Sequence, residues 1–192
     1  MKKIGILGGT FDPPHIGHLA MAEEARIKFA LDEIWWMPNR LPPHKSLTGT
    51  TEKQRIEMVE QMVRLSPAFV LCLNEMERKG PSYTIDTFSE LQTEFPEHDF
   101  YFIMGGDSYE TFHLWHGFKK LQEMLAFIVM ERPGTQTSEV RPQDFKSIHF
   151  LERIQLDISS TSIRNSIKEG TWNRFLVTEG VAEVIKEHQL YE

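Results

Sequence analysis

The sequence predicts a doubly wound α/β fold built on a mostly parallel sheet. Short apolar runs alternate with amphipathic segments along almost all of its 192 residues. The apolar runs are continuous, which is typical of strands that helices cover on both faces. Repeated strand–helix units assemble into parallel sheets through right-handed crossovers, so we expect a Rossmann-like architecture.

Six apolar runs are the predicted strands. One of them contains Trp35 and Trp36 side by side, and we expect both rings to lie in the core. Another contains Cys72, the one cysteine of the chain, which we expect to be a buried core residue rather than a catalytic thiol. The runs are Lys3–Leu7, Glu33–Met37, Phe69–Leu73, Phe100–Met104, Ala126–Met130 and Ile148–Leu151.

The amphipathic segments between these runs are the predicted helices. Thr51 and Gln54 match a capping box at the start of one of them. Two stretches rich in turn-forming residues, Asn39–Thr50 and Pro133–Asp144, are predicted loops, and no pattern marks a domain boundary within residues 1–192. The helices are predicted from Ile16 to about Leu31 and at Thr51–Leu65, Thr84–Phe95, Phe118–Leu125, Ser162–Lys168 and Val177–His188.

The composition limits the partners and the compartment of the protein. A formal net charge of −7 argues against nucleic acid as a partner, because nucleic-acid-binding domains carry basic surfaces. A single cysteine cannot form a disulfide within one chain, which suits a reducing compartment. The sequence has no secretory signal pattern and no apolar run long enough to span a membrane. We therefore expect a soluble, cytoplasmic protein without a nucleic-acid or membrane partner.

The segment Gly8–His18 predicts a phosphate site. It reads Gly-Gly-Thr-Phe-Asp-Pro-Pro-His-Ile-Gly-His, follows the first predicted strand and opens the first predicted helix. His15 and His18 share one face of the first helical turn, where backbone N–H groups and the helix dipole favour negative charge. A metal pair is the alternative, although only Asp12 is near enough in sequence to add a ligand. For Asp12 itself, a helix N-cap or turn role is an equal candidate.

Two distant motifs together carry a family resemblance. Gly8–His18 and Ile158–Arg164, which reads Ile-Ser-Ser-Thr-Ser-Ile-Arg, resemble the two motifs of the nucleotidyltransferase superfamily that shares His-x-Gly-His. Three internal segments narrow the resemblance to the bacterial nicotinate-nucleotide adenylyltransferases over essentially the whole chain. These segments are Pro42-Pro43-His44-Lys45, Ser82-Tyr83-Thr84, and Gly105-Gly106-Asp107 followed by Trp115.

The resemblance implies a Rossmann-like nucleotidyltransferase fold and a reaction in NAD biosynthesis. ATP and nicotinate mononucleotide would be the substrates, and nicotinate adenine dinucleotide and pyrophosphate the products. The mononucleotide phosphate is already ionised, so alignment and charge stabilisation are needed rather than a covalent nucleophile. Mg²⁺ is expected mainly on the ATP phosphates, with no dedicated protein ligands. Family members are commonly dimers, which makes a homodimer a candidate assembly.

The resemblance also assigns the ATP half of the site. The segment Ser159–Thr161 serves at minimum as the N-cap of the following helix. Arg164 distinguishes phosphate binding from capping, because a cap alone does not require an arginine there. Arg132 would reach the triphosphate, and a surface salt bridge is a nearly equal alternative for it. The implied catalytic residues are His15, His18, Lys45 and Arg164. The implied ATP-binding residues are Gly8, Gly9, Thr10, Phe11, His15, His18, Gly106, Asp107, Arg132, Ile158, Ser159, Ser160, Thr161 and Arg164.

The acceptor half rests on Trp115 and Thr84. An indole face suits the cationic pyridinium ring, although a core or interface role for Trp115 is the alternative. Thr84 and backbone amides near Trp115 would hold the nicotinate carboxylate, whereas His44 and Lys45 could also be ordinary solvated loop residues. The implied residues for the mononucleotide are Asn39, His44, Lys45, Ser82, Tyr83, Thr84, Trp115 and His116.

Three other functions share part of this pattern. Phosphopantetheine adenylyltransferases and cytidylyltransferases share the first motif but lack the Ser-Tyr-Thr and Gly-Gly-Asp…Trp arrangement. Class I aminoacyl-tRNA synthetases share His-Ile-Gly-His, but this sequence has no Lys-Met-Ser-Lys-Ser-type loop, and its acidic balance disfavours tRNA. A non-catalytic nucleotide-binding module on the same fold is the third alternative.

Overall fold

The protein is built around a six-stranded sheet in which every paired neighbour is parallel. The computed structural model describes residues 1–40, 50–78, 83–130, 142–151 and 156–192. The strand order is β3-β2-β1-β4-β5-β6. The strands are β1 (Lys3–Gly9), β2 (Glu33–Pro38), β3 (Phe69–Leu71), β4 (Asp99–Gly105), β5 (Ala126–Met130) and β6 (Ser147–Leu151). All six predicted strands are confirmed, with boundary shifts of up to two residues.

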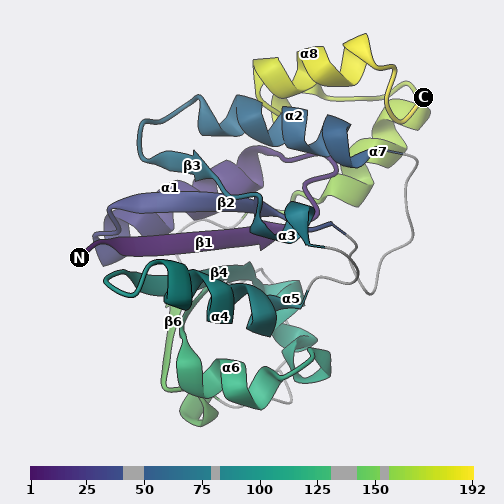
Figure 1. Ribbon diagram of the computed structural model, residues 1–192. Helices are drawn as coiled ribbons and strands as arrows, with labels where there is room; N and C mark the ends of the chain where they lie inside the picture. The colour runs from purple at the N-terminus through teal and green to yellow at the C-terminus, as the bar shows by residue number, and fades with distance from the viewer. Residues whose placement is uncertain (41–49, 79–82, 131–141, 152–155) are drawn as a thin grey trace.

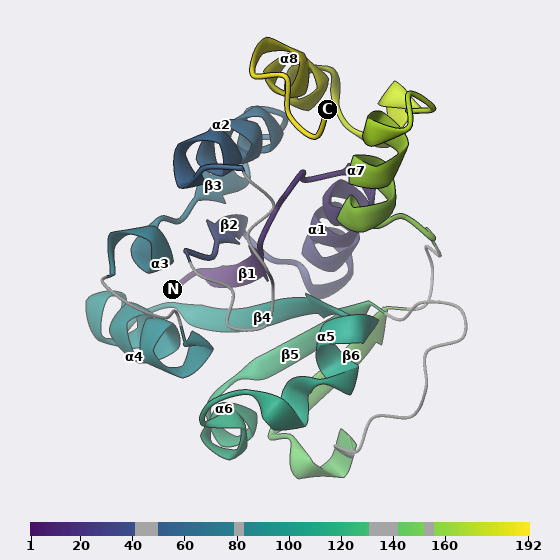
Figure 2. The ribbon, with the colours of Figure 1, turned by 90° about the vertical axis from the view of Figure 1, so that its right-hand side faces the viewer.

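Helices cover both faces of the sheet, as Figures 1 and 2 show. One face carries α1 (Ile16–Phe29), α2 (Glu52–Val63), α7 (Ser160–Lys168) and α8 (Glu179–Glu187), and the other carries α4 (Thr84–Glu94), α5 (Gly106–Glu110) and α6 (Phe118–Met124). The doubly wound prediction is therefore confirmed. The short elements α3 (Asn74–Glu77), α5, and the 3₁₀ turns Phe112–Leu114, Pro142–Asp144 and Arg174–Leu176 were not predicted.

Strand alternation divides the core into two layers. In β2, Trp36 packs with the α1 and α2 side, whereas Trp35 packs with the α4 and α6 side. Both tryptophans are buried, as predicted. Cys72 is buried in the second layer, and this burial raises the pKa of its thiol to about 11.

Helix starts follow the capping chemistry of the sequence. The predicted capping box of α2 is confirmed, because the Gln54 N–H donates to Thr51 Oγ1 at 3.2 Å and the Thr51 N–H donates to Gln54 Oε1 at 2.9 Å. The start predicted for α7 at Ser162 is wrong by two residues. Ser159 is the N-cap and accepts from the Ser162 N–H at 3.1 Å, so the helix begins at Ser160.

The strand order reverses at β1, which lies between β2 and β4. The chain leaves β1 toward α1 on one face and leaves β4 toward α5 on the other (Figure 2). Open α/β sheets bind ligands in the crevice that opens at this switch point. None of the helices in the described parts of the chain is both long and apolar enough to cross a membrane.

Candidate active site

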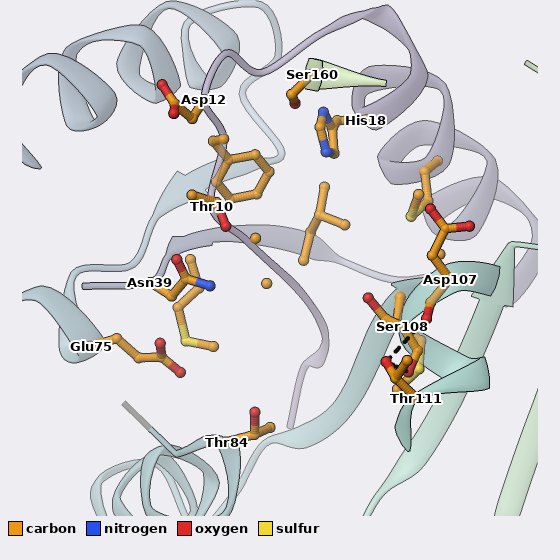
Figure 3. A pocket seen from close by; sticks show the side chains of 18 of the residues that line it. Thr10, Asp12, His18, Asn39, Glu75, Thr84, Asp107, Ser108, Thr111 and Ser160 are labelled. Atoms are coloured by element: carbon orange, nitrogen blue, oxygen red, sulfur yellow. Dashed lines mark hydrogen bonds between the residues drawn. The ribbon is translucent and has the colours of Figure 1, made fainter. Parts of the chain in front are cut away.

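A cavity of about 960 Å³ opens at the carboxyl edge of the sheet. Residues that follow β1, β2 and β4 line it, together with the first turns of α4 and α7 (Figure 3). Pockets for drug-sized ligands measure about 300–1,000 Å³, so this one lies at the large end of that range. Its position is the switch-point crevice that the topology predicts.

The loop after β1 forms one wall of the cavity. The Phe11 side chain is buried, and its ring meets the His18 ring edge-on at 5.1 Å and the Trp36 ring at 5.5 Å. At Gly8, a Cβ atom would meet the Phe102 ring at 3.1 Å, so a side chain there would crowd the sheet. Phe11 therefore anchors the loop to the core, and Gly8 and Gly9 allow the end of β1 to pack closely against the Phe102 and Phe11 rings.

The two histidines of the first motif lie against each other at the start of α1. His15 is the N-cap, and the centres of the His15 and His18 rings are 3.8 Å apart. The His15 backbone N–H donates to His18 Nδ1 at 3.2 Å. This hydrogen bond assigns the neutral tautomer in which His18 Nε2 carries the proton, so Nε2 is the N–H donor of a side chain that lines the cavity.

The predicted N-cap role of Asp12 is wrong, because His15 caps α1. Asp12 is instead buried within the loop. The Tyr191 hydroxyl donates to Asp12 Oδ1 at 2.6 Å, and Arg164 Nη1 donates to the Asp12 carbonyl at 2.8 Å. Asp12 thus links the first motif to two distant parts of the chain.

The second motif packs directly on the first. Ser160 Oγ donates to the Pro13 carbonyl at 2.8 Å, across 147 positions of sequence. Arg164 holds both the Asp12 carbonyl and Thr161 Oγ1, the latter at 3.2 Å. The N-terminus of α7 and the Arg164 guanidinium therefore line the same cavity as the loop after β1. Ser159 therefore caps α7, and the same helix start also faces the cavity.

The opposite wall carries the aromatic and hydroxyl groups expected for the acceptor. Trp115 is half-buried, and its ring lies 5.8 Å from that of Phe102 and 5.4 Å from that of Phe112. Thr84 is the first residue of α4, and the rings of Tyr83 and His116 lie 4.5 Å apart. Trp115 is thus fixed by the core on one side while it lines the cavity on the other.

Comparisons with known proteins identify the family of this chain. The cytidylyltransferase-like family model matches residues 6–166. A probable nicotinate-nucleotide adenylyltransferase of Oceanobacillus iheyensis is 44% identical over 191 residues, which cover 100% of this chain and 97% of the relative. The nicotinate-nucleotide adenylyltransferase of Bacillus subtilis is 42% identical over 193 residues, covering 100% of both chains. The chain belongs to the nicotinate-nucleotide adenylyltransferase family.

Solved structures support the fold. The nicotinic acid mononucleotide adenylyltransferase of Plasmodium falciparum, complexed with NaAD, superposes with a TM-score of 0.83 at 24% identity, covering 100% of this chain and 98% of that one. The same protein complexed with APC gives a TM-score of 0.82 at 22% identity, with the same coverage. The Rossmann-like nucleotidyltransferase fold implied by the resemblance is thereby confirmed.

Most residues assigned from the family motifs meet at this one cavity. His44, Lys45, Ser82 and Arg132 lie outside the described residues. Gly106 and Ile158 are buried and do not line the cavity. The assigned residues that line it are Gly8, Gly9, Thr10, Phe11, His15, His18, Asn39, Tyr83, Thr84, Asp107, Trp115, His116, Ser159, Ser160, Thr161 and Arg164.

Two buried charged residues at the cavity were missed by sequence reasoning. Arg55 lies in α2 and Glu75 in α3, and each is less than 5% exposed. Both line the cavity. Their sequence signal is weak, because a charged residue in an amphipathic segment is usually solvated. Among the described residues, no group of three or more His, Cys, Asp or Glu side chains is arranged to hold a metal ion.

Proposed function

We propose that this protein transfers the adenylyl group of ATP to nicotinate mononucleotide, forming nicotinate adenine dinucleotide and pyrophosphate. The observation that carries the proposal is the junction of the two motifs at one cavity. Ser160 and Arg164 bond to the Pro13 and Asp12 carbonyls, and Trp115 lies on the opposite wall. Membership in the nicotinate-nucleotide adenylyltransferase family supports the same substrates.

The β1 wall is suited to the triphosphate. Backbone N–H groups of Gly9–Phe11 and the N-terminus of α7 are donors, and helix N-termini favour anions. His18 Nε2–H and the Arg164 guanidinium add directed donors to the same wall. Together these groups match the charge that builds up on the departing pyrophosphate.

The reaction itself needs no protein nucleophile. An oxygen of the mononucleotide 5′-phosphate forms a bond to the ATP α-phosphorus, while the bond from that phosphorus to the bridging α,β-oxygen breaks. The electron pair leaves with pyrophosphate, and the attacking phosphate is already ionised at neutral pH. The task of the protein is to align the two phosphates and to stabilise the leaving group.

Mg²⁺ is the metal expected with ATP. The Asp107 carboxylate and the Ser108 and Thr111 hydroxyls are oxygen donors at the cavity, which is the ligand type that Mg²⁺ prefers. When bound through ATP, the ion neutralises part of the phosphate charge. Asp107 would accept hydrogen bonds from the ribose hydroxyls of ATP.

The Trp115 wall is suited to the mononucleotide. A tryptophan face attracts a cationic pyridinium, and the packing of Trp115 on Phe102 and Phe112 holds the indole in place before the ligand arrives. Thr84 and the backbone N–H group of His116 would receive the nicotinate carboxylate. The expected backbone donor at Trp115 itself is wrong, because its N–H donates to the Phe112 carbonyl at 3.0 Å. His44, Lys45 and Ser82 complete the proposed acceptor site, and Arg132 the ATP site.

A substrate panel tests the proposal. The protein is incubated with ATP and Mg²⁺ and with nicotinate mononucleotide, nicotinamide mononucleotide or phosphopantetheine, and dinucleotide and pyrophosphate are measured by chromatography. We expect equal amounts of nicotinate adenine dinucleotide and pyrophosphate with the first acceptor. Turnover with phosphopantetheine alone would assign the chain to a different transferase, and ATP binding without pyrophosphate release would make it a non-catalytic module.

Two further expectations accompany this function. A biosynthetic enzyme with one buried cysteine suits the cytoplasm. A homodimer is the assembly common in the family, and light scattering coupled to size exclusion would measure the mass in solution.

A further inference from the structure

Arg55 ties together the two loops that form the halves of the cavity. Its side chain reaches from α2 to the carboxyl ends of β1 and β2. Nη1 donates to the Thr10 carbonyl at 2.9 Å and to the Asn39 carbonyl at 2.7 Å, and Nη2 donates to the Arg40 carbonyl at 3.1 Å. Thr10 is the residue after β1 and Asn39 the residue after β2, and Figure 3 shows both at the ends of these strands.

A buried guanidinium needs such partners. Arg55 is 4% exposed, and burial of a charge is unfavourable unless hydrogen bonds and opposite charge offset it. Asp12 and Glu52 supply opposite charge nearby. The three carbonyl acceptors come from both loops, so the favourable geometry exists only when the two loops hold one separation. Arg55 therefore couples the position of one loop to that of the other.

Tyr191 fixes the same region from another side. Its hydroxyl donates to Asp12 Oδ1 at 2.6 Å, and the Asp12 carbonyl accepts from Arg164 at 2.8 Å. Tyr191 follows α8, which packs against α2. The loop after β1 is thus held at Thr10 by α2, and at Asp12 by α7 and by the segment after α8.

We propose that Arg55 and Tyr191 are positioning residues. Arg55 holds the ATP loop (Thr10–Asp12) and the acceptor loop (Asn39–Arg40) at the separation needed for in-line transfer, and Tyr191 holds the ATP loop in place at Asp12. The inference rests on the proposed function. Arg55 lines the cavity, but the three hydrogen bonds that its guanidinium donates all go to main-chain carbonyls. In-line attack depends on the relative position of two phosphates, and a misplacement of about 1 Å can lower the rate about 100-fold.

Arg55→Lys separates positioning from phosphate binding. Lysine keeps the charge, but its single ammonium cannot reproduce the planar fork that reaches three carbonyls. We expect kcat to fall about 30- to 100-fold, while the dissociation constants of ATP and nicotinate mononucleotide each change less than about threefold. A large rise in the ATP dissociation constant with kcat retained would overturn the inference, because it would make Arg55 a phosphate ligand.

Tyr191→Phe is the second variant, and it removes one hydroxyl while the ring stays in place. We expect kcat to fall about three- to tenfold with little change in either KM. Tyr101→Phe is the matched control, since Tyr101 is a half-buried tyrosine of β4 outside the cavity lining. Its kcat is expected to equal that of the wild type.

The double variant tests whether the two residues act as a unit. Arg55 and Tyr191 hold the same loop, at Thr10 and at Asp12. Residues coupled through one backbone segment give non-additive effects, so Arg55→Lys combined with Tyr191→Phe should be slowed less than the product of the single effects. Circular dichroism and melting temperature verify that each variant is folded. Wild-type kcat in a folded Tyr191→Phe variant would refute the role of Tyr191. Failure of the wild type itself to make the dinucleotide would refute the proposed function instead.

Discussion

His18 offers a substitution in which helix capping and catalysis can be separated atom by atom. Its Nδ1 accepts from the His15 backbone N–H at 3.2 Å, which leaves Nε2–H as the donor at the cavity. Asparagine places its amide oxygen near the position of Nδ1 but has no group at the position of Nε2. Glutamine places an N–H near Nε2 but has no acceptor near Nδ1. His18→Asn therefore keeps the cap, and His18→Gln keeps the donor.

We expect His18→Asn to lose turnover and keep its stability, and His18→Gln to lose stability and keep most of its turnover. Loss of one preorganised donor to developing charge lowers kcat about 10²- to 10³-fold, so we expect that loss for His18→Asn with an unchanged melting temperature. Loss of a cap lowers the free energy of unfolding by about 1 kcal/mol. His18→Gln should therefore be less stable, but it should keep kcat within about tenfold because it retains the donor. For a chain of this length, 1 kcal/mol lowers the melting temperature by about 2–4 °C.

The assay is dinucleotide formation at saturating concentrations of both substrates, with ATP binding measured by calorimetry and melting by fluorimetry. His18→Ala lacks both groups and should combine the two losses. A His18→Asn variant as fast as the wild type would refute the donor role of Nε2. A His18→Gln variant as slow as His18→Ala would refute the assigned tautomer.

Three further predictions concern Trp115, Cys72 and Tyr191. Trp115→Ala should weaken nicotinate mononucleotide binding about 3- to 30-fold and leave ATP binding little changed, with Trp115→Phe intermediate; equal losses for both ligands would make the indole structural. The pKa of the Cys72 thiol is raised to about 11 by burial, so a thiol reagent at pH 8 should react only as fast as the protein opens, and rapid labelling of the native protein would contradict this. Burial raises the pKa of Tyr191, so the folded state retains this proton where the unfolded state loses it. Its contribution should be complete below about pH 10 and should decline above it, which denaturant titrations of wild type and Tyr191→Phe from pH 8 to 11 would measure.

Local signals account for most of the fold. The β2 run with Trp35 and Trp36 predicted a strand buried on both faces, and the two rings do lie in different core layers. The capping box at Thr51 and Gln54 was predicted because its hydrogen bonds span three positions. The short helices α3 and α5 escaped prediction, since four or five residues carry too little periodicity to mark a helix.

The sequence by itself determined the fold class, the family and most of the residues that meet at the cavity, because apolar runs and contiguous motifs are local patterns that can be recognised in the sequence. Only the tertiary structure decided what joins them. Ser160 meets Pro13 across 147 positions and Tyr191 meets Asp12 across 179, and no local pattern encodes such pairings. The role of Arg55 could not be predicted either, since a charged residue in a helix is ordinarily solvated. Arg55 is buried here because three carbonyls from two loops converge on it.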